Sequence, residues 1–170
     1  MMKLTKKALT IALIIFMIGA FSDFAQAAKK YKFQLEDHYQ IEQVRGSTSE
    51  RLLIKAWATA SNAKKAIEKA KQDAIAATIF GGSDAITPIL RHVESFDEHR
   101  DYFEEFFTKG EYLNYVEEIN SAFPTGENNI QTPEGRRVGI LLIVYSSQLR
   151  EKLEQDGIAV KMSDILNQPH

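Results

Sequence analysis

The stretch LIKAWATA (residues 53–60) runs directly into SNAKKAIEKAKQDAIAATIFGG (residues 61–82), and this pair decides the fold. Residues 52–60 alternate with the period of two that is typical of a β-strand. The side expected to face the core consists of Leu52, Ile54, Ala56 and Ala58. The segment that follows has the period of a helix, so we predict a strand that leads into a long helix packed on it.

The boundaries and the faces of this helix are marked in the sequence. Ser61 and Asn62 are favourable N-caps, and Gly81-Gly82 is a typical stop because glycine accepts the left-handed backbone at a helix C-terminus. The apolar stripe is nearly all alanine, which lets the helix lie close to a sheet: Ala63, Ala66, Ile67, Ala70, Ala74 and Ala77. The side expected to face solvent carries Lys64, Lys65, Glu68, Lys69, Gln72 and Asp73.

The amino-terminal residues have the three parts of a secretory signal. Basic residues (Lys3, Lys6 and Lys7) precede an uncharged run over residues 9–21, and Ala25-Gln26-Ala27 supplies a small-x-small cleavage site. The run is shorter than the ~20 residues that a membrane-spanning helix needs. We therefore expect a cleaved signal peptide over 1–27, a single domain over 28–170 whose residues 158–170 form a partly ordered tail, and export to the periplasm or the extracellular space.

Composition excludes several classes of function. The 170 residues include no cysteine, so a disulfide framework, thiol catalysis, cysteine-bound zinc and a lipidated cysteine are all ruled out. The net charge of −2 offers no basic excess for phosphates, so nucleic acid is not an expected partner. A hydrophobic content of 44% is typical of a globular protein.

The remaining pattern predicts a mixed fold. We expect one or two short strands over 33–44, a second helix over 96–107, and a strand over 112–119, for which a helix is the alternative. A loop over 123–136 follows, then a central strand over 138–145 covered on both faces, and a last helix over 148–155 capped by Ser146-Ser147. The order is ββααββα. The prediction is therefore an α+β two-layer sandwich, with a mostly antiparallel sheet of about four strands and helices on one face.

Several of these residues carry a resemblance. They are Ala56-Trp57, the alanines at 63, 66, 70 and 74, Ile79-Phe80-Gly81-Gly82, Tyr102 to Phe107, Tyr112-Leu113, Leu149 to Glu154 and Gly157-Ile158. In them the chain resembles small exported bacterial envelope proteins of unassigned activity. It is more distantly similar to the amino-terminal domain of flagellar T-ring proteins and to small outer-membrane lipoprotein domains. The resemblance implies scaffolding or assembly at the envelope and no catalytic site, although the lipidated cysteine of the lipoprotein members is missing.

No catalytic motif stands out. His92 and His99, with Glu94, Asp97 and Asp101, are the sharpest candidates for a metal site, because seven residues span about two helical turns. The spacing of four that helical zinc ligands share is absent, so exposed histidines on an acidic helix are the simpler interpretation. Ser146-Ser147 lacks the glycines of a nucleophile elbow. We therefore predict no catalytic residue, no metal ligand and no cofactor.

The sequence favours function through protein contacts. The candidate partner surface combines a dense aromatic segment with the long loop: Phe103, Phe106, Phe107, Tyr112, Asn128 and Asn129. The partners would be other envelope proteins or a second copy of the chain. The alternatives are a periplasmic protein that binds a small ligand or a metal, and an apolar cavity between sheet and helices that holds a lipid-like ligand.

Overall fold

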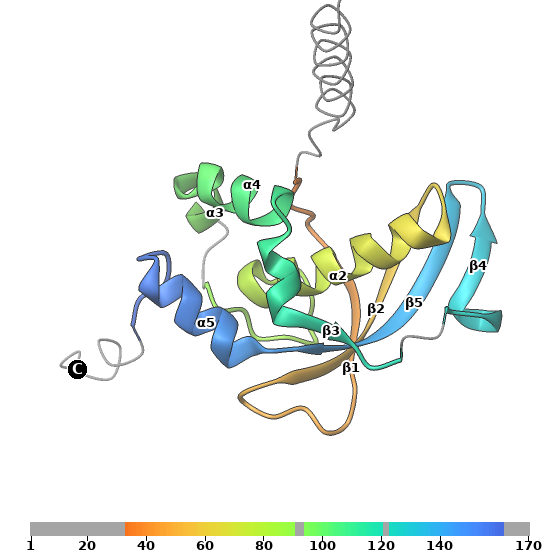
Figure 1. The fold of residues 1–170 in the computed structure, drawn as a ribbon, viewed down its shortest axis with the longest axis horizontal. Coiled ribbons are helices and arrows are strands. Elements are labelled where there is room, and N and C mark those ends of the chain that lie inside the picture. Colours follow the sequence, from red (N-terminus) through yellow and green to blue (C-terminus); the bar gives the residue numbers. More distant parts are fainter. Residues whose placement is uncertain (1–32, 91–93, 121–122, 162–170) are drawn as a thin grey trace, which may run out of the picture. The chain divides into compact units, whose positions relative to one another are not determined.

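The protein folds around an open antiparallel sheet of five strands, which makes it an α+β protein. The structure is a computed structural model that describes residues 33–90, 94–120 and 123–161. The strands are β1 (Gln40–Gln43), β2 (Leu52–Ala60), β3 (Val116–Glu118), β4 (Asn129–Thr132) and β5 (Gly135–Val144). The sheet order is β1-β2-β5-β3, and β4 also pairs with β5 (Figure 1). The expected sheet was one strand smaller, and the signal peptide expected over 1–27 lies outside the described residues.

The strand–helix unit forms as predicted. β2 ends at Ala60, and α2 (Ala63–Phe80) begins after Asn62, whose side chain accepts a hydrogen bond from the Lys65 amide. The helix ends at Gly81, which has a φ of 90°. α2 packs across β2 and β5 (Figure 1). The contact is made by fully buried small side chains, which keep the helix close to the sheet: Ala66, Ala70, Ala74 and Ala77 from α2 and Ile54 and Ala56 from β2.

β5 is the central strand of the sheet. It pairs with β2 over nine residues on one edge, and on its other edge with β3 near Val144 and with β4 near Gly135. The position was predicted correctly, but the described residues cover this strand on one face and not on both as expected. The alternate residues Val138, Ile140, Leu142 and Val144 are buried under α2 and its neighbours, whereas Leu141 is 37% exposed. The sheet is therefore covered on one face.

Aromatic side chains form a second part of the core beside α2. Phe33, Phe80, Phe96, Phe103 and Phe107 pack ring against ring, with centroids between 3.8 and 6.1 Å apart. Phe33 was predicted to begin a strand, but it lies before β1 and packs into this cluster. The segment over 33–44 therefore contains one short strand.

The helix expected over 96–107 is interrupted. It consists of α3 (Glu94–Glu98) and α4 (Arg100–Thr108), which are separated by His99 with a φ of −120° and a ψ of 30°. Phe96 of α3 and Phe103 of α4 both pack against Phe80, so the two helices share one aromatic core across the break.

The strand expected over 112–119 is mostly a 3-10 helix, η1 (Glu111–Tyr115), and only Val116–Glu118 pairs in the sheet. The loop expected over 123–136 holds a 3-10 turn, η2 (Gly126–Asn128), and the strand β4, which forms a hairpin with β5. β4 has the sequence NIQT, which lacks an apolar alternation. The pairing with β5 creates this strand, and its own sequence does not predict it.

The last helix, α5 (Ser146–Gln155), begins two residues earlier than predicted. Its N-cap position is Tyr145, and the hydroxyls of Ser146 and Ser147 donate to the carbonyl of Ser49 at 3.3 and 3.4 Å. The serines therefore tie α5 to the loop before β2 instead of capping the helix. In the segment after α5, Ala159 is buried and Val160 is 61% exposed, while Ile165 and Leu166 lie outside the described residues.

Candidate functional site: the open face of the sheet

The sheet face opposite α2 exposes apolar side chains. We call it the open face, and its centre is formed by the outward residues of β2 and β5, which are Leu53, Lys55, Trp57, Arg137, Leu141 and Ile143. Beside them lie Ile119, Phe123 and Ile130, with exposed fractions of 43%, 57% and 40%. Four of the six large hydrophobic residues that are exposed within the described ranges therefore gather on this face. Such a gathering is typical of an interaction site.

The strand register fixes which residues share this face. Ile130 pairs with Arg137, and the Ile119 amide donates to the Leu141 carbonyl at 3.1 Å, so these residues are neighbours across the strands. Glu118 points the other way, since it forms an ion pair with Lys71 of α2 at 2.5 Å. Ile119 therefore lies on the open face by the alternation of side chains.

Trp57 lies at the middle of the open face, directly over Gly139. A Cβ atom on Gly139 would lie 2.7 Å from the indole ring, so the ring needs a glycine beneath it. The Lys55 Nζ and the Arg137 guanidinium each lie 4.5 Å from the ring centroid. Arg137 also donates to the Gln40 side chain at 2.9 Å across β2. Cation–π contacts and this hydrogen bond fix the tryptophan and both cations in place.

A hollow of about 290 Å³ adjoins this centre near the segment after β3. Phe123, Leu141, Lys55 and Asn128 contribute to its lining. The Asn128 Oδ1 atom is buried and has no hydrogen-bond partner within the described residues. A buried acceptor without a partner is costly.

The predicted partner residues fall into two groups. Phe103, Phe106, Phe107 and Tyr112 are 0%, 1%, 3% and 8% exposed, so they belong to the core and do not form a surface. This part of the prediction is wrong because α4 turns its phenylalanines inward and η1 turns Tyr112 inward. The two asparagines are half-buried beside the open face: Asn128 lines the hollow, while Asn129 holds the loop by donating to the Pro124 carbonyl at 2.9 Å.

A second hollow, of about 370 Å³, lies at the β1 edge of the sheet and reaches Trp57 and Arg137. Its charged cluster is formed by Asp73 and Lys69 of α2 with Glu36. Lys69 Nζ lies 2.9 Å from Asp73 and 2.5 Å from Glu36. Asp73 was expected in solvent but is 8% exposed, because the segment before β1 covers it. Burial raises the pKa of Asp73 to about 6, against the opposing attraction of Lys69, and raises that of Tyr39 beside it to about 12.

The raised pKa of Asp73 makes stability depend on pH. Between the ordinary value of 3.8 and about 6, the folded protein binds more protons than the unfolded chain, so stability falls as the pH rises through this window. The two-unit shift corresponds to roughly 3 kcal/mol at most. We expect Asp73→Asn to match the wild type at pH 4 and to be about 1–3 kcal/mol more stable at pH 7. Urea unfolding at both values measures this, and a difference that is constant with pH would contradict it.

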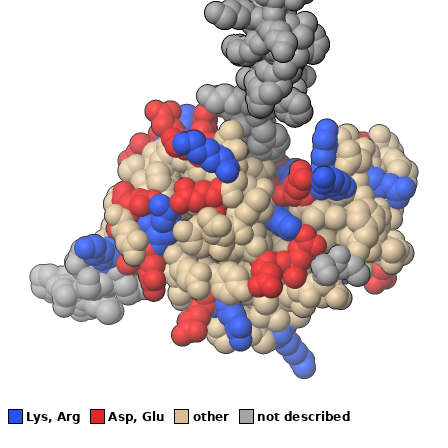
Figure 2. Space-filling model, viewed as in Figure 1, with Lys and Arg blue, Asp and Glu red and all other residues tan. Residues whose placement is uncertain are grey.

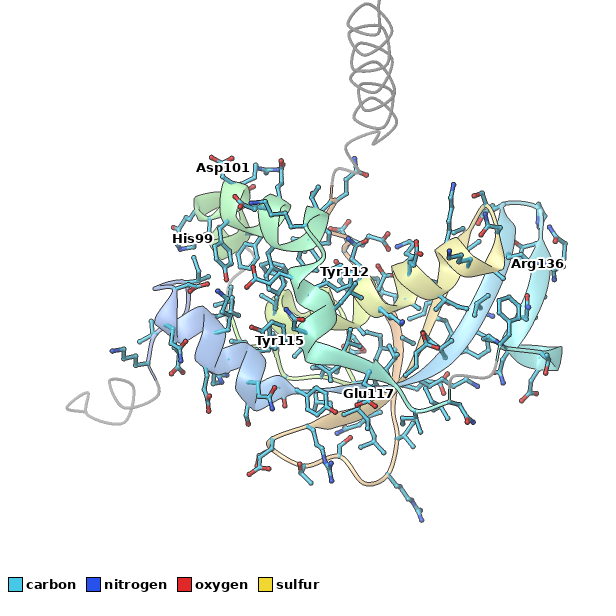
Figure 3. All side chains as sticks on the ribbon, viewed as in Figure 1. His99, Asp101, Tyr112, Tyr115, Glu117 and Arg136 are labelled. Atoms are coloured by element: carbon cyan, nitrogen blue, oxygen red, sulfur yellow. The ribbon has the colours of Figure 1, made fainter. Side chains whose placement is uncertain are left out.

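The histidine cluster is not assembled in the described residues. His99 lies at the break between α3 and α4, next to Arg100, which pairs with Asp97 (Figure 3). His92 and the side chain of Glu94 lie outside the described residues. Within the ranges that the structure describes, no group of three or more histidine, aspartate or glutamate residues is placed to hold a metal ion.

Sequence reasoning missed the open face because it interpreted residues 138–145 as a strand covered on both sides. A signal for it was present: Trp57, Lys55 and Thr59 lie on the side of residues 52–60 that was not assigned to the core. Because this side of residues 52–60 mixes polar and apolar side chains, it is not expected to be covered by a second layer. The alternate residues of the apolar run 138–145 that share this face are then exposed as well.

Comparison with protein-family models, with curated proteins and with solved structures finds no match to this chain. Within the described residues, every helix is too short or too polar to cross a membrane.

Proposed function

We propose that this chain is an exported, non-catalytic envelope protein that works through protein–protein contacts made by the open face. The observation that carries the proposal is the apolar face, with Trp57 at its centre, that the described residues leave uncovered. The signal-like residues 1–27 and the resemblance to envelope assembly proteins support the location and the class of function. The protein would act as a scaffold or an assembly accessory.

The composition of the open face favours a protein partner. Tryptophan and arginine are the residue types that most often carry binding energy at interfaces, and Trp57 and Arg137 are held here in fixed positions. Because these two side chains are already fixed, less conformational entropy is lost when a partner binds. Covering the exposed leucine, isoleucine and phenylalanine side chains contributes ~25 cal/mol per Å² of apolar area removed from water.

A position-specific crosslinking experiment in cells tests this proposal. A photo-reactive amino acid at position 141 is expected to give a discrete crosslinked product, because Leu141 lies on the open face. The same group at position 160 is the control, since Val160 is 61% exposed but lies after α5. Ile119→Asp introduced beside the photo-reactive group at 141, with Val160→Asp as its match, is expected to abolish the product, because Ile119 is 43% exposed on the same face. Equal products from both positions, or none from 141, would contradict the proposal.

The hollow at the β1 edge supports a second candidate function, the binding of a small ligand. Its lining combines the aromatic rings of Tyr39 and Trp57 with the charges of Asp73, Lys69 and Arg137, so a ligand with both an apolar part and charged groups would fit. Because Trp57 is the only tryptophan, its fluorescence reports binding. Native mass spectrometry of protein purified from the envelope tests this function, and a mass equal to the bare chain would contradict it.

A further inference from the structure

We propose that the hollow at the β1 edge binds a short peptide with free amino and carboxyl ends, which pairs with the unpaired edge of β2. The inference rests on the second candidate function, the binding of a small ligand, and names the class of that ligand. It follows from the strand register at this edge and from the placement of charge around the hollow.

β2 continues for three residues past the start of β1. Gln40, the first residue of β1, pairs with Trp57, so residues 58–60 have no strand on this side within the described part of the chain. The chain before Gln40 turns away from this position, since the Tyr39 amide donates to the Gly82 carbonyl at 2.7 Å. The hollow therefore lies where the next strand would be, beside residues 58 and 59.

Thr59 turns a main-chain donor and a main-chain acceptor toward the hollow. The Leu53 carbonyl accepts from the Val44 amide at 2.8 Å, so the main chain of Leu53 faces β1. Main-chain groups alternate in direction along a strand, so those of Trp57 and Thr59 face the same side. Trp57 has Gln40 opposite it, whereas Thr59 has no partner on this side among the described residues. Its N–H and C=O groups can exchange two hydrogen bonds with one residue of an added strand.

An unpaired charge lies at each end of the hollow. The Arg137 guanidinium lies at the Gln40 end, where it donates to the Gln40 side chain, and it has no carboxylate partner among the described residues. Glu134 lies at the other end, in the hairpin turn that packs against Ala60, and no described cation pairs with it. Lys69 is held by two carboxylates, so Arg137 is the permanent cation available to a ligand.

These groups fix the direction and the length of the peptide. The carboxyl end of a strand in line with β1 points toward Gln40, and Tyr39 closes the hollow there, so only a chain end fits. The last residue would pair with Thr59, and its carboxylate would lie in the gap of about 7 Å along the strand between Thr59 and Gln40. The Arg137 guanidinium lies beside this gap. Two more residues, about 7 Å of strand, bring the amino end to Glu134.

A peptide satisfies groups that simpler ligands leave without partners. A small anion would bind Arg137 but leave the Thr59 carbonyl and Glu134 without donors. A short peptide supplies a donor and an acceptor at the spacing of a strand, together with a carboxylate and an ammonium group. Figure 2 shows Lys and Arg mixed with Asp and Glu over the face in view. A ligand with both charges therefore gains from individually placed groups and not from a broad field of one sign.

Titration of the exported protein with trialanine, followed by the fluorescence of Trp57, tests the proposal. Trp57 lines the hollow and is the only tryptophan. Saturable binding is expected below about 10 mM, the range of a ligand this small. Alanine side chains suffice because the main chain makes the contacts. Trialanine amide lacks the carboxylate, and trialanine N-methylated at its last residue lacks the donor to Thr59. Each is expected to bind about tenfold more weakly.

Arg137→Gln is the matching change in the protein. It is expected to abolish the preference for trialanine over its amide, and this ratio of affinities is independent of any change in the fluorescence of Trp57 itself. Arg136→Gln is the control and is expected to keep the preference, because Arg136 points to the opposite side of the strand and contacts Asn129. Acetylation of the amino end is expected to weaken binding to the wild type about tenfold and to have little effect on Glu134→Gln.

Several results would overturn the inference. They are a wild type that shows no saturable binding of trialanine, equal affinities of the wild type for the acid and the amide, and an unchanged preference in Arg137→Gln. An acetylated peptide that binds as tightly as the free one also overturns it, because the site would then take the end of a longer chain. A bound mass in native mass spectrometry that is not a peptide leaves the small-ligand function standing without this inference. The crosslink at position 141 is a separate result, since Leu141 does not line this hollow.

Discussion

Phe103→Ala is expected to lower the free energy of unfolding by about 3–5 kcal/mol, because it removes a fully buried ring from the middle of the aromatic core. The ring of Phe103 packs against Phe80, Phe96 and Tyr102, so its loss leaves a cavity that three neighbours border. These rings belong to α2, α3 and α4, so the space cannot close unless the helices move. Urea unfolding followed by the fluorescence of Trp57 measures the change.

Phe123→Ala is the matched control for this substitution. Phe123 has the same side chain but is 57% exposed on the open face, so its removal is expected to change stability by no more than about 0.5 kcal/mol. Equal losses for Phe103→Ala and Phe123→Ala would show that the aromatic residues of α4 are not the core. If Phe123→Ala changes stability as little as expected, it also serves to test binding by the open face without loss of the fold.

Gly135→Ala is expected to destabilise the protein by about 3 kcal/mol or more, because two unfavourable effects add at this position. The residue has a φ of 135°, which side-chain-bearing residues rarely adopt. A Cβ atom would also lie 2.2 Å from the Ala60 carbonyl oxygen, which belongs to the backbone at the end of β2. Relief of this contact requires the β4–β5 hairpin to move away from β2.

Gly126→Ala separates the two effects. Gly126 has a φ of 61°, but a Cβ atom there would meet nothing within 4 Å. Only the cost of the left-handed backbone applies, which is about 1–2 kcal/mol. Thermal unfolding of the two variants in parallel measures the difference. If Gly135→Ala lowers the stability no more than Gly126→Ala does, the hairpin does not approach Ala60 as closely as described.

The candidate site shows where sequence reasoning stopped. The aromatic residues 103, 106, 107 and 112 have the composition of a binding surface and also that of a core, and composition alone does not separate these roles. The structure buries all four. It exposes Leu141 and Ile119, which the sequence assigned to a covered strand and to an ordinary strand end. Whether a side chain is exposed depends on which elements pack on that face of the strand, and the sequence of the strand alone does not determine this.

Local signals predicted the elements that depend on local physics. The alternation over 52–60, the alanine stripe, Asn62 as the cap and Gly81 as the stop each act within a few residues, so the β2–α2 unit formed as expected. The α+β class also followed from these patterns. β4 could not be predicted from its own residues, because it forms through its pairing with Gly135–Val138 in the hairpin, and no signal in the sequence marks the break at His99.

The sequence by itself therefore determined the strand–helix unit that organises the fold, since its spacing and caps are local properties. The tertiary structure decided that the described residues cover only one face of the sheet, that Trp57 contacts Lys55 and Arg137 above Gly139, and that Lys69 of α2 pairs with Glu36 beside the buried Asp73. These arrangements join residues up to about 80 positions apart in the chain. Only strand register and layer packing, which act over such separations, bring them together.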